Sequence, residues 1–243
     1  MDRSTYDRMR ELQDHHWWFR GRRRIISGLL SDLALPDPAK VLEVGCGPGG
    51  NLTMLRRFGE VTGLEPDEES RRYAAERMGV RVEGGLLPDE LPFAPASFDL
   101  VCAFDVIEHV DDDASAVAAL GRLLKVGGRL ATTVPGQPWM WGPHDALHHH
   151  KRRYRLGGYR SLFEAAGLTV LKASYFNTLL FPPIAAVRLA KLALRSRSAD
   201  DDSLPPAPVN DLLAGLFGAE LHWLRRLPLP TGVSIVVIAQ RPA

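Results

Sequence analysis

A glycine-rich turn after a short apolar run constrains the fold of this sequence more than any other feature. Residues 40–44 (KVLEV) lead directly into residues 45–50 (GCGPGG). An apolar run of this length that ends at glycines is typical of a strand buried inside a parallel sheet. Glycine permits a tight turn and a close approach of the backbone to a ligand, and a helix that begins near Gly50 offers unpaired N–H groups to that ligand. The segment therefore predicts an α/β fold with a binding loop after its first strand.

An acidic residue follows the second expected strand, at a place where a carboxylate can bind a sugar beside such a loop. A second strand is expected over residues 60–64, and Glu65 follows it, 20 residues after Gly45. A carboxylate at this place can accept hydrogen bonds from both hydroxyls of a ribose. Gly45, Gly47 and Gly50 also satisfy the dinucleotide pattern GxGxxG, which by itself is a weak signal. Strand, turn and acidic residue together predict a site for a ribose-containing cofactor.

Strand-like and helix-like segments alternate along the chain. The expected strands are 40–44, 60–64, 80–83, 98–104, 129–135, 168–176 and 232–240, and helices are expected near 50 and at 67–78, 112–125 and 157–166. This alternation predicts a parallel, doubly wound sheet. The segment before the last strand is longer than a connection needs and holds two apolar helical stretches. We therefore expect one domain with these parts: an N-terminal helical lid (1–35), a cofactor-binding core (36–176), a helical cap (177–231) and a last strand (232–243).

Composition restricts the partners of this chain. Its 243 residues include 30 basic and 29 acidic ones, and this balance argues against capture of nucleic acid. Cys46 and Cys102 are the two cysteines, and they offer neither metal-ligand spacing nor a disulfide framework. The charged N-terminus lacks a signal-peptide core, so we expect a cytoplasmic protein. Four basic residues of the cap would suit an anionic membrane surface or an acidic acceptor: Arg188, Lys191, Arg195 and Arg197.

Four segments resemble, in order, the successive motifs of class I S-adenosylmethionine-dependent methyltransferases: LEVGCGPGGN, GLEPDEES, LPFAPASFDLVCAFDVIEHVDD and LLKVGGRLATTVP. The resemblance is clear over about residues 38–176 and is nearest to the type 11 branch, which includes ubiquinone- and menaquinone-pathway enzymes. It implies a Rossmann-like sheet of seven strands, mostly parallel with an antiparallel last strand. It also implies S-adenosylmethionine as the cofactor.

The resemblance assigns roles around this cofactor. Loop backbone would line the methionine portion, Glu65 would hold the ribose, and an arginine of the N-terminal lid would pair with the methionine carboxylate. Many relatives carry an acidic residue near Gly85 that contacts the adenine amino group, whereas this chain has Leu86 beside it. Adenine would therefore rest on backbone and apolar contacts. The expected cofactor residues are Arg22, Glu43, Gly45, Cys46, Gly47, Glu65, Pro66, Leu86, Phe104 and Asp105.

Three histidines are candidates for the proton acceptor of the reaction. Methyl transfer to a hydroxyl needs alignment of the nucleophile and removal of its proton. Ligands of open α/β sheets bind beyond the carboxyl ends of the strands, where His109 follows the fourth strand and His144 and His150 follow the fifth. Two alternatives stay open, that His109 orients the next helix and that the loop histidines are solvated. The neighbouring residues of the run 148–150 rarely point at one ion, so we expect no metal.

The acceptor site is expected to be aromatic. Trp139 and Trp141 would wall an apolar pocket, and Trp18 would seal the site from the N-terminal lid. The alternative is that these aromatic residues only pack helices onto the sheet. The full set of expected substrate-binding residues is Trp18, Trp139, Trp141, Asp145 and Tyr154.

We expect methylation of a small molecule, most readily on oxygen, in secondary, lipid, sugar or quinone-type metabolism. Methylation of nitrogen or carbon stays open. A nicotinamide-dependent oxidoreductase is the main rival, but short-chain members need a Tyr-x-x-x-Lys pair, and none of the five tyrosines has one. A fold that binds the cofactor without turnover is a third reading.

Overall fold

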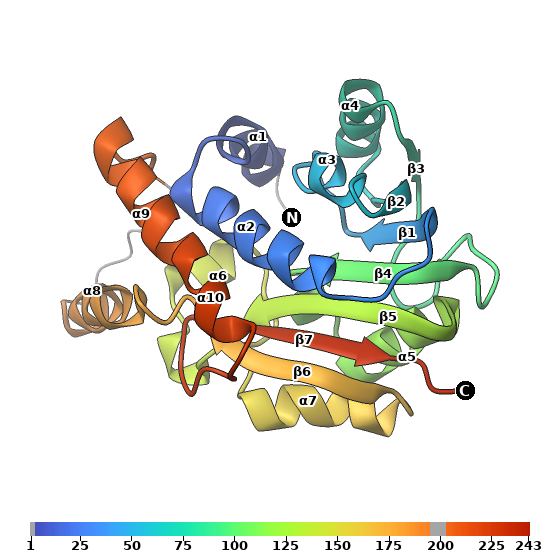
Figure 1. Cartoon of the computed structure of the whole chain (residues 1–243). Helices are drawn as coiled ribbons and strands as arrows, with labels where there is room; N and C mark the ends of the chain where they lie inside the picture. The colour runs from blue at the N-terminus through green and yellow to red at the C-terminus, as the bar shows by residue number, and fades with distance from the viewer. Residues whose placement is uncertain (1–2, 195–202) are drawn as a thin grey trace.

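Seven strands form one sheet in the computed structural model, which describes residues 3–194 and 203–243. They are β1 (Ala39–Val44), β2 (Gly59–Leu64), β3 (Arg81–Glu83), β4 (Phe98–Phe104), β5 (Leu124–Pro135), β6 (Thr169–Phe176) and β7 (Ser234–Gln240). Their order across the sheet is β3-β2-β1-β4-β5-β7-β6 (Figure 1). β7 runs antiparallel to β5 and β6, and the other strand pairs are parallel. The expected Rossmann-like sheet with an antiparallel last strand is therefore confirmed.

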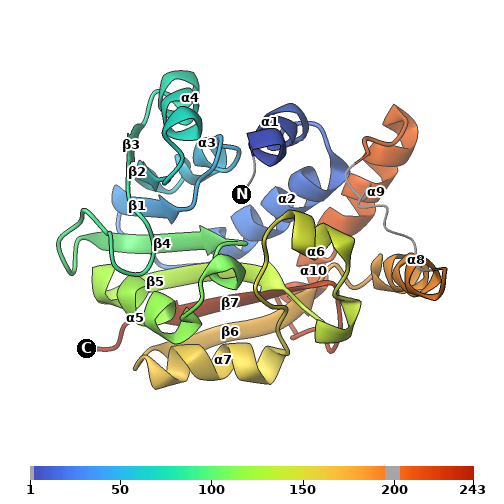
Figure 2. The ribbon, with the colours of Figure 1, turned by 180° about the vertical axis from the view of Figure 1, so that it is seen from behind.

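Helices cover both faces of this sheet. One apolar core lies under α2 (Trp17–Ser31), α3 (Leu52–Leu55), α4 (Glu68–Met78), α9 (Ala207–Ala219) and α10 (Leu221–Leu224). The other lies under α5 (Asp113–Leu123) and α7 (Leu156–Ala165). The remaining helical segments gather near the carboxyl ends of the parallel strands (Figure 2), and they are α1 (Arg3–Leu12), η1 (Ile107–His109), η2 (Pro138–Met140), α6 (Pro143–Leu147) and α8 (Phe181–Ala193).

Local sequence explains where individual elements begin and end. All seven residues of β4 are buried, because both faces of this central strand are covered, and its sequence is accordingly a nearly continuous apolar run. α4 begins after Asp67, whose carboxylate accepts a hydrogen bond from the Ser70 N–H at 2.8 Å. It ends at Gly79, whose φ of 59° is left-handed. A polar N-cap and a C-terminal glycine thus set the length of this helix.

β5 is longer than the sequence predicted. It begins at Leu124, although Gly127 and Gly128 indicated a strand that starts at residue 129. Gly127 has a φ of 78°, and the pairing with β4 shifts register between Phe98 and Leu100. The glycines therefore accommodate an irregularity inside the strand instead of preceding it.

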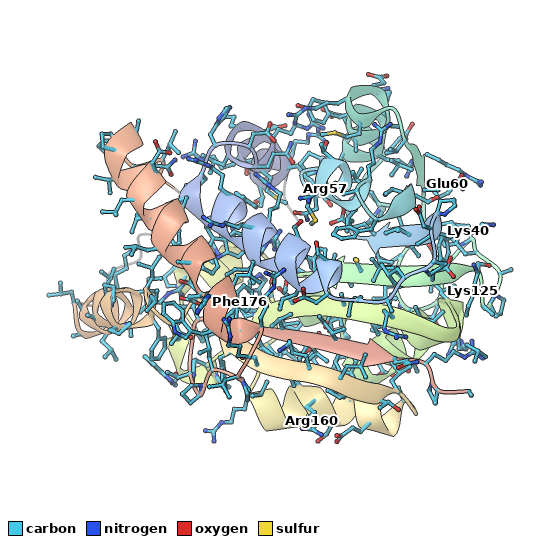
Figure 3. The ribbon with its side chains drawn as sticks, viewed as in Figure 1. Lys40, Arg57, Glu60, Lys125, Arg160 and Phe176 are labelled. Carbon is cyan, nitrogen blue, oxygen red and sulfur yellow. The ribbon has the colours of Figure 1, made fainter. Side chains whose placement is uncertain are left out.

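The segment between β6 and β7 is helical, as expected, and α9 packs against α2. A Cβ atom on Gly21 would lie only 2.5 Å from Cδ1 of Phe217, so the absent side chain lets the two helices approach. Phe217 is fully buried and stacks on Phe176 of β6, with ring centroids 5.9 Å apart. Figure 3 labels Phe176 near the C-terminal end of α9, where α10 follows. The cap is thereby attached both to the sheet and to the N-terminal helices.

The membrane contact suggested by the cap stays a prediction. Arg195 and Arg197 lie outside the described residues. Among residues 3–194 and 203–243, no helix is both long and apolar enough to cross a bilayer.

Candidate functional site

A cavity of about 1340 Å³ opens at the carboxyl ends of the parallel strands. Its walls come from the turns after β1, β2 and β4, from α1 and α2, from the segment after β5, and from α8. Pockets for one drug-sized ligand occupy about 300–1,000 Å³. The cavity is therefore large enough for a nucleoside-type cofactor together with a second ligand.

The glycine turn forms one wall of this cavity. Gly45 and Gly47 have φ values of 66° and 54°, and both line the cavity. A Cβ on Gly45 would lie 2.6 Å from Cγ2 of Val106, so only glycine fits this position. The turn is fixed to β2 because the Gly45 N–H donates to the carbonyl oxygen of Leu64 at 2.8 Å.

Two of the expected cofactor residues lie behind this turn rather than in the cavity wall. Glu43 is buried, and it accepts a hydrogen bond from Asn51 Nδ2 at 2.7 Å. Burial raises the pKa of Glu43 to about 7, and the bond from Asn51 opposes this shift. Cys46 is also buried, and burial raises the pKa of its thiol. Glu43 thus contacts Asn51 behind the turn, while the side chain of Cys46 packs in the core, and the roles of both residues toward the cofactor stay predictions.

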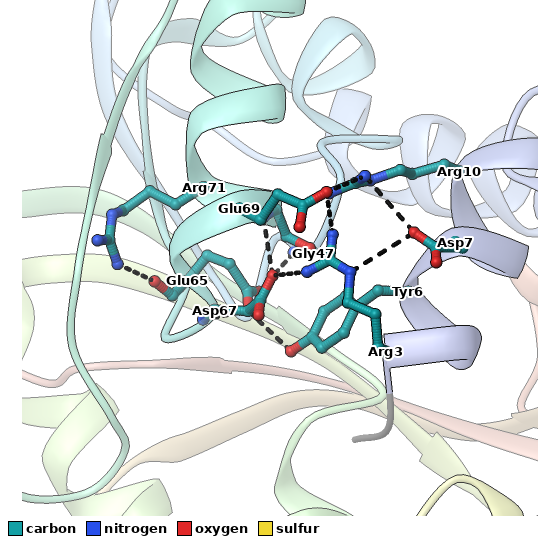
Figure 4. Close-up of polar contacts among 10 residues, drawn as sticks. Arg3, Tyr6, Asp7, Arg10, Gly47, Glu65, Asp67, Glu69 and Arg71 are labelled. Atoms are coloured by element: carbon teal, nitrogen blue, oxygen red, sulfur yellow. Dashed lines mark hydrogen bonds and ion pairs between the residues drawn. The ribbon is translucent and has the colours of Figure 1, made fainter.

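Glu65 lines the cavity at the end of β2 and is held by three donors (Figure 4). Tyr6 of α1 donates its hydroxyl to Oε1 at 2.9 Å, the Gly47 N–H donates to Oε2 at 2.8 Å, and the Asp67 N–H donates to Oε1 at 3.0 Å. Burial raises the pKa of Glu65, although these three hydrogen bonds oppose the shift. The carboxylate that the sequence singled out therefore carries a contact from the N-terminal helix.

Asp105 follows β4 and lines the cavity in a left-handed conformation, with a φ of 58°. Thr133 donates its hydroxyl to Oδ1 at 3.1 Å, and Arg22 forms an ion pair with Oδ2. The guanidinium of Arg22 also lies over the Trp18 ring, 4.4 Å from its centroid. The lid arginine that was expected at a ligand carboxylate thus has a carboxylate of the protein as its partner. Non-glycine residues with positive φ are often found at functional sites.

The remaining expected cofactor residues lie together in the cavity wall. Pro66, Leu86 and Phe104 all line the cavity. Leu86 is 54% exposed, so it presents an apolar side chain at the cavity.

The three candidate histidines gather on another wall of this cavity. The ring centroids of His109 and His150 are 4.8 Å apart, and those of His144 and His150 are 6.3 Å apart. Burial lowers the pKa of His109 to about 4, and the charge of His150 adds to this shift. His109 is therefore neutral near pH 7. The structure thus places these three residues, from segments after two different strands, on one wall, and their catalytic role stays a prediction.

Asp145 holds the histidine wall in place from behind. It is fully buried and does not line the cavity, and its carboxylate accepts from His150 Nδ1 at 3.0 Å and from Arg153 Nε at 2.7 Å. Burial alone would raise the pKa of Asp145, but the bond from His150 and the charge of Arg153 lower it below its ordinary value. Asp145 is thus an ionised residue that orients His150, rather than a residue that touches a substrate.

The other expected acceptor residues lie differently from the prediction. Trp139 and Trp141 are 49% and 44% exposed and are not in the cavity wall, whereas Met140 between them is buried in the protein. Tyr154 is buried and donates its hydroxyl to Asp113 at 2.9 Å, away from the cavity. Of the expected aromatic residues, Trp18 lines the cavity.

Sequence reasoning missed Tyr6 and the apolar wall from α8. This wall is formed by Pro183, Ile184 and Val187 of α8 and by Leu180 just before it. The one signal for Tyr6 was the amphipathic pattern of residues 3–12, in which Tyr6 and Met9 recur at helical spacing. The sequence places the residues of this apolar wall in the helical cap, which can shape an acceptor pocket, without singling them out.

Comparisons with known proteins agree with this architecture. A family model described as a methyltransferase domain matches residues 18–173. A probable S-adenosylmethionine-dependent methyltransferase of Mycolicibacterium smegmatis is 31% identical over 163 residues, which are 65% of this chain and 62% of the relative. A ubiquinone biosynthesis O-methyltransferase of Leptothrix cholodnii is 35% identical over 131 residues, which are 47% of this chain and 55% of the relative. The chain thus spans less than two thirds of the length of either curated relative.

A solved structure extends the likeness to the whole fold. A Haloferax volcanii methyltransferase, solved in complex with the Trm112 methyltransferase activator, is 20% identical. It superposes with a TM-score of 0.63 over 98% of this chain and 95% of its own. At this identity the likeness concerns the fold alone. The family match covers more than half of the sequence, and the chain therefore belongs to the methyltransferase domain family, within the class I S-adenosylmethionine-dependent methyltransferases.

Proposed function

We propose that this protein transfers the methyl group of S-adenosylmethionine to a hydroxyl oxygen of a small molecule. One observation carries this proposal: a single cavity is lined both by Glu65 and the glycine turn and by the wall of His109, His144 and His150. A cofactor and a proton acceptor can therefore face the same acceptor molecule. The likeness to an O-methyltransferase of ubiquinone biosynthesis supports oxygen as the methylated atom.

The residues around the glycine turn fit the cofactor. The positive φ of Gly47 leaves its backbone open toward the cavity, with Met9 Cε as the nearest side-chain atom, 3.5 Å from the position of a Cβ. Glu65 offers carboxylate oxygens to a ribose, and Asp105, paired with Arg22, lines the same cavity after β4. When bound, S-adenosylmethionine supplies a methyl group activated by its positively charged sulfur.

The remaining walls suit an acceptor with an apolar body and a hydroxyl. The body would pack against Ile184 and Val187 of α8. The hydroxyl oxygen would form a bond to the methyl carbon as the carbon–sulfur bond breaks, and that electron pair stays on the sulfur. The hydroxyl proton would pass to His144 or His150, whose imidazole rings line the same cavity.

Methyl transfer from labelled cofactor tests this proposal. The protein is incubated with S-adenosylmethionine carrying a labelled methyl group and with matched acceptors that share an apolar skeleton but end in a phenol, an alcohol or an amine. Mass spectrometry then identifies the methylated atom. We expect O-methylated product, and transfer only to nitrogen or carbon would contradict the proposal.

Binding separates this function from its rivals. S-adenosylhomocysteine should raise the melting temperature, because it binds the folded state, whereas NAD(H) should not. Stabilisation by NAD(H) alone would favour an oxidoreductase. Stabilisation by S-adenosylhomocysteine without turnover of any acceptor would favour a fold that only binds the cofactor.

A further inference from the structure

Three side chains from two separate segments converge on the cavity wall. Glu108 and His109 belong to η1 after β4, and His150 follows α6. One carboxylate oxygen and one ring nitrogen from each histidine all lie within 4.8 Å of one another. All three residues line the cavity. The cluster therefore combines a carboxylate and two imidazoles at a place that a ligand can reach.

The carboxylate of Glu108 has no partner within the described protein. Glu108 is 0% exposed, and neither of its two oxygens accepts a hydrogen bond from the residues that the structure describes. An ionised carboxylate buried without a partner is destabilising by several kcal/mol. A bound cation would remove this cost, and Glu108 faces the two imidazoles that could share such a cation.

The two histidines are held in the manner of metal ligands. His150 uses Nδ1 for its hydrogen bond with the buried carboxylate of Asp145, at 3.0 Å. His109 is hydrogen-bonded to the backbone of His149. In metal sites, a ligating histidine commonly donates its other ring N–H to a carboxylate or a backbone carbonyl, which fixes the ring. Each ring thus keeps one nitrogen for the cluster.

We propose that Glu108, His109 and His150 bind one divalent transition-metal ion, for which zinc is the best-matched member. Two imidazoles and one carboxylate form a ligand set of catalytic zinc sites, in which a fourth position stays open. Ligand atoms around a tetrahedral zinc lie about 3.3 Å apart for bonds of about 2.0–2.1 Å. Small side-chain rotations therefore suffice to close the cluster.

The sequence argument against a metal concerned a different set of residues. Neighbours in the run 148–150 do not all point at one ion, and only His150 of this run belongs to the cluster. The other two ligands come from the segment after β4, which the fold of the sheet brings beside this loop.

The ion would take part in the proposed methyl transfer. The catalytic role of the ion rests on that proposed function, whereas the binding of the ion does not. A hydroxyl oxygen at the fourth position would lose its proton more readily, because a metal lowers the pKa of a bound hydroxyl. The proton would pass to His144, which lines the cavity outside the cluster. The resulting oxygen would then attack the methyl carbon as described above.

The test measures metal binding directly, on protein without a histidine tag. After treatment with a chelator, Zn²⁺ is titrated by calorimetry, and Co²⁺ is added as a spectroscopic probe of tetrahedral coordination. Glu108→Gln and His150→Ala remove ligands, and Asp145→Asn weakens the support of His150. His148→Ala is the matched control, because His148 lines the same cavity but lies outside the cluster. The melting-temperature shift caused by S-adenosylhomocysteine shows that each variant folds.

We expect one Zn²⁺ per chain for the wild type and for His148→Ala. Asp145→Asn should weaken binding about 10–100-fold, as loss of a supporting partner does, and Glu108→Gln and His150→Ala should weaken it further. Failure of the wild type to bind Zn²⁺, or equal affinity in wild type and Glu108→Gln, would overturn the metal site. In that case hydroxyl methylation by the chelated protein would leave the proposed function standing. Zn²⁺ binding without any methyl transfer would support the metal site and contradict the proposed function.

Discussion

Replacing Tyr6 with phenylalanine should tighten cofactor binding, because Tyr6 occupies the carboxylate that we assign to the ribose. A carboxylate offers about four lone-pair sites. In Glu65, three of these sites accept hydrogen bonds, from the Tyr6 hydroxyl and from the N–H groups of Gly47 and Asp67. A ribose has two hydroxyls to place, so one present donor must leave. The two N–H groups belong to fixed backbone, and the side chain of Tyr6 is the donor that can move.

The size of the effect follows from the bond that must break. A hydrogen bond to a charged group contributes about 1.5–3 kcal/mol. The displaced hydroxyl finds water or another acceptor, so the net cost lies at the lower end of this range. A difference of about 1.4 kcal/mol corresponds to a tenfold change in the dissociation constant. We therefore expect Tyr6→Phe to bind S-adenosylhomocysteine about tenfold more tightly than the wild type.

Isothermal titration calorimetry with S-adenosylhomocysteine measures this change. Tyr73→Phe is the matched control, because Tyr73 lies on α4 and its polar contact is with Arg77, not with Glu65. The unliganded Tyr6→Phe protein should also melt at a lower temperature, since it lacks the same hydrogen bond. An affinity that is unchanged or weaker in Tyr6→Phe would refute the competition between Tyr6 and the ribose.

Three further predictions concern the walls of the site. Phe217→Ala should lower the free energy of unfolding by about 3–5 kcal/mol, since it empties a fully buried contact between α9 and the sheet; a loss below about 1 kcal/mol in chemical denaturation would contradict this packing. The folded-state pKa of Glu43, about 7, is raised from 4.5, so the stability that Glu43 contributes is full below pH 4.5 and is lost as pH rises through 7. Relative to Glu43→Gln, the wild type should therefore lose about 3 kcal/mol over this interval, and parallel pH curves of the two proteins would disprove the shift. Arg22→Ala should lower both the melting temperature and the affinity for S-adenosylhomocysteine, because it leaves Asp105 unpaired, whereas Arg20→Ala removes an exposed ion pair and should change neither.

The sequence predicted the sheet and the cofactor loop well because both depend on local signals. Apolar runs, glycines and the acidic residue after β2 are each readable within a few positions. Strand β4 was predicted with its observed bounds, since a strand covered on both faces is apolar along its whole length. Gly127 misled the prediction of β5, because an irregularity within a strand and the end of a strand use the same residue.

The contacts between distant segments could not be predicted in this way. Tyr6 meets Glu65 across 59 positions, and this contact depends on how α1 packs over the sheet. Arg22 meets Asp105 across 83 positions for the same reason. The orientation of Trp139 depends on which residue of η2 turns inward, and in this chain it is Met140. Periodicity identifies an apolar face, but not the neighbour that covers it.

The position of β7 between β5 and β6 has a consequence for the order in which the protein is assembled during synthesis. Among the described strands, β6 has β7 as its single neighbour, so β6 cannot join the sheet before residues 234–240 exist. At translation rates of about 5–20 residues per second, the ribosome needs roughly 5–20 s to proceed from the end of β5 to the end of β7. During this interval strands β1 to β5, which include the glycine-turn side of the sheet, have all been synthesised. The edge of β5 that later pairs with β7 has no neighbouring strand. The nascent chain thus completes the part of the sheet that carries the glycine turn first, and the edge formed by β7 and β6 last.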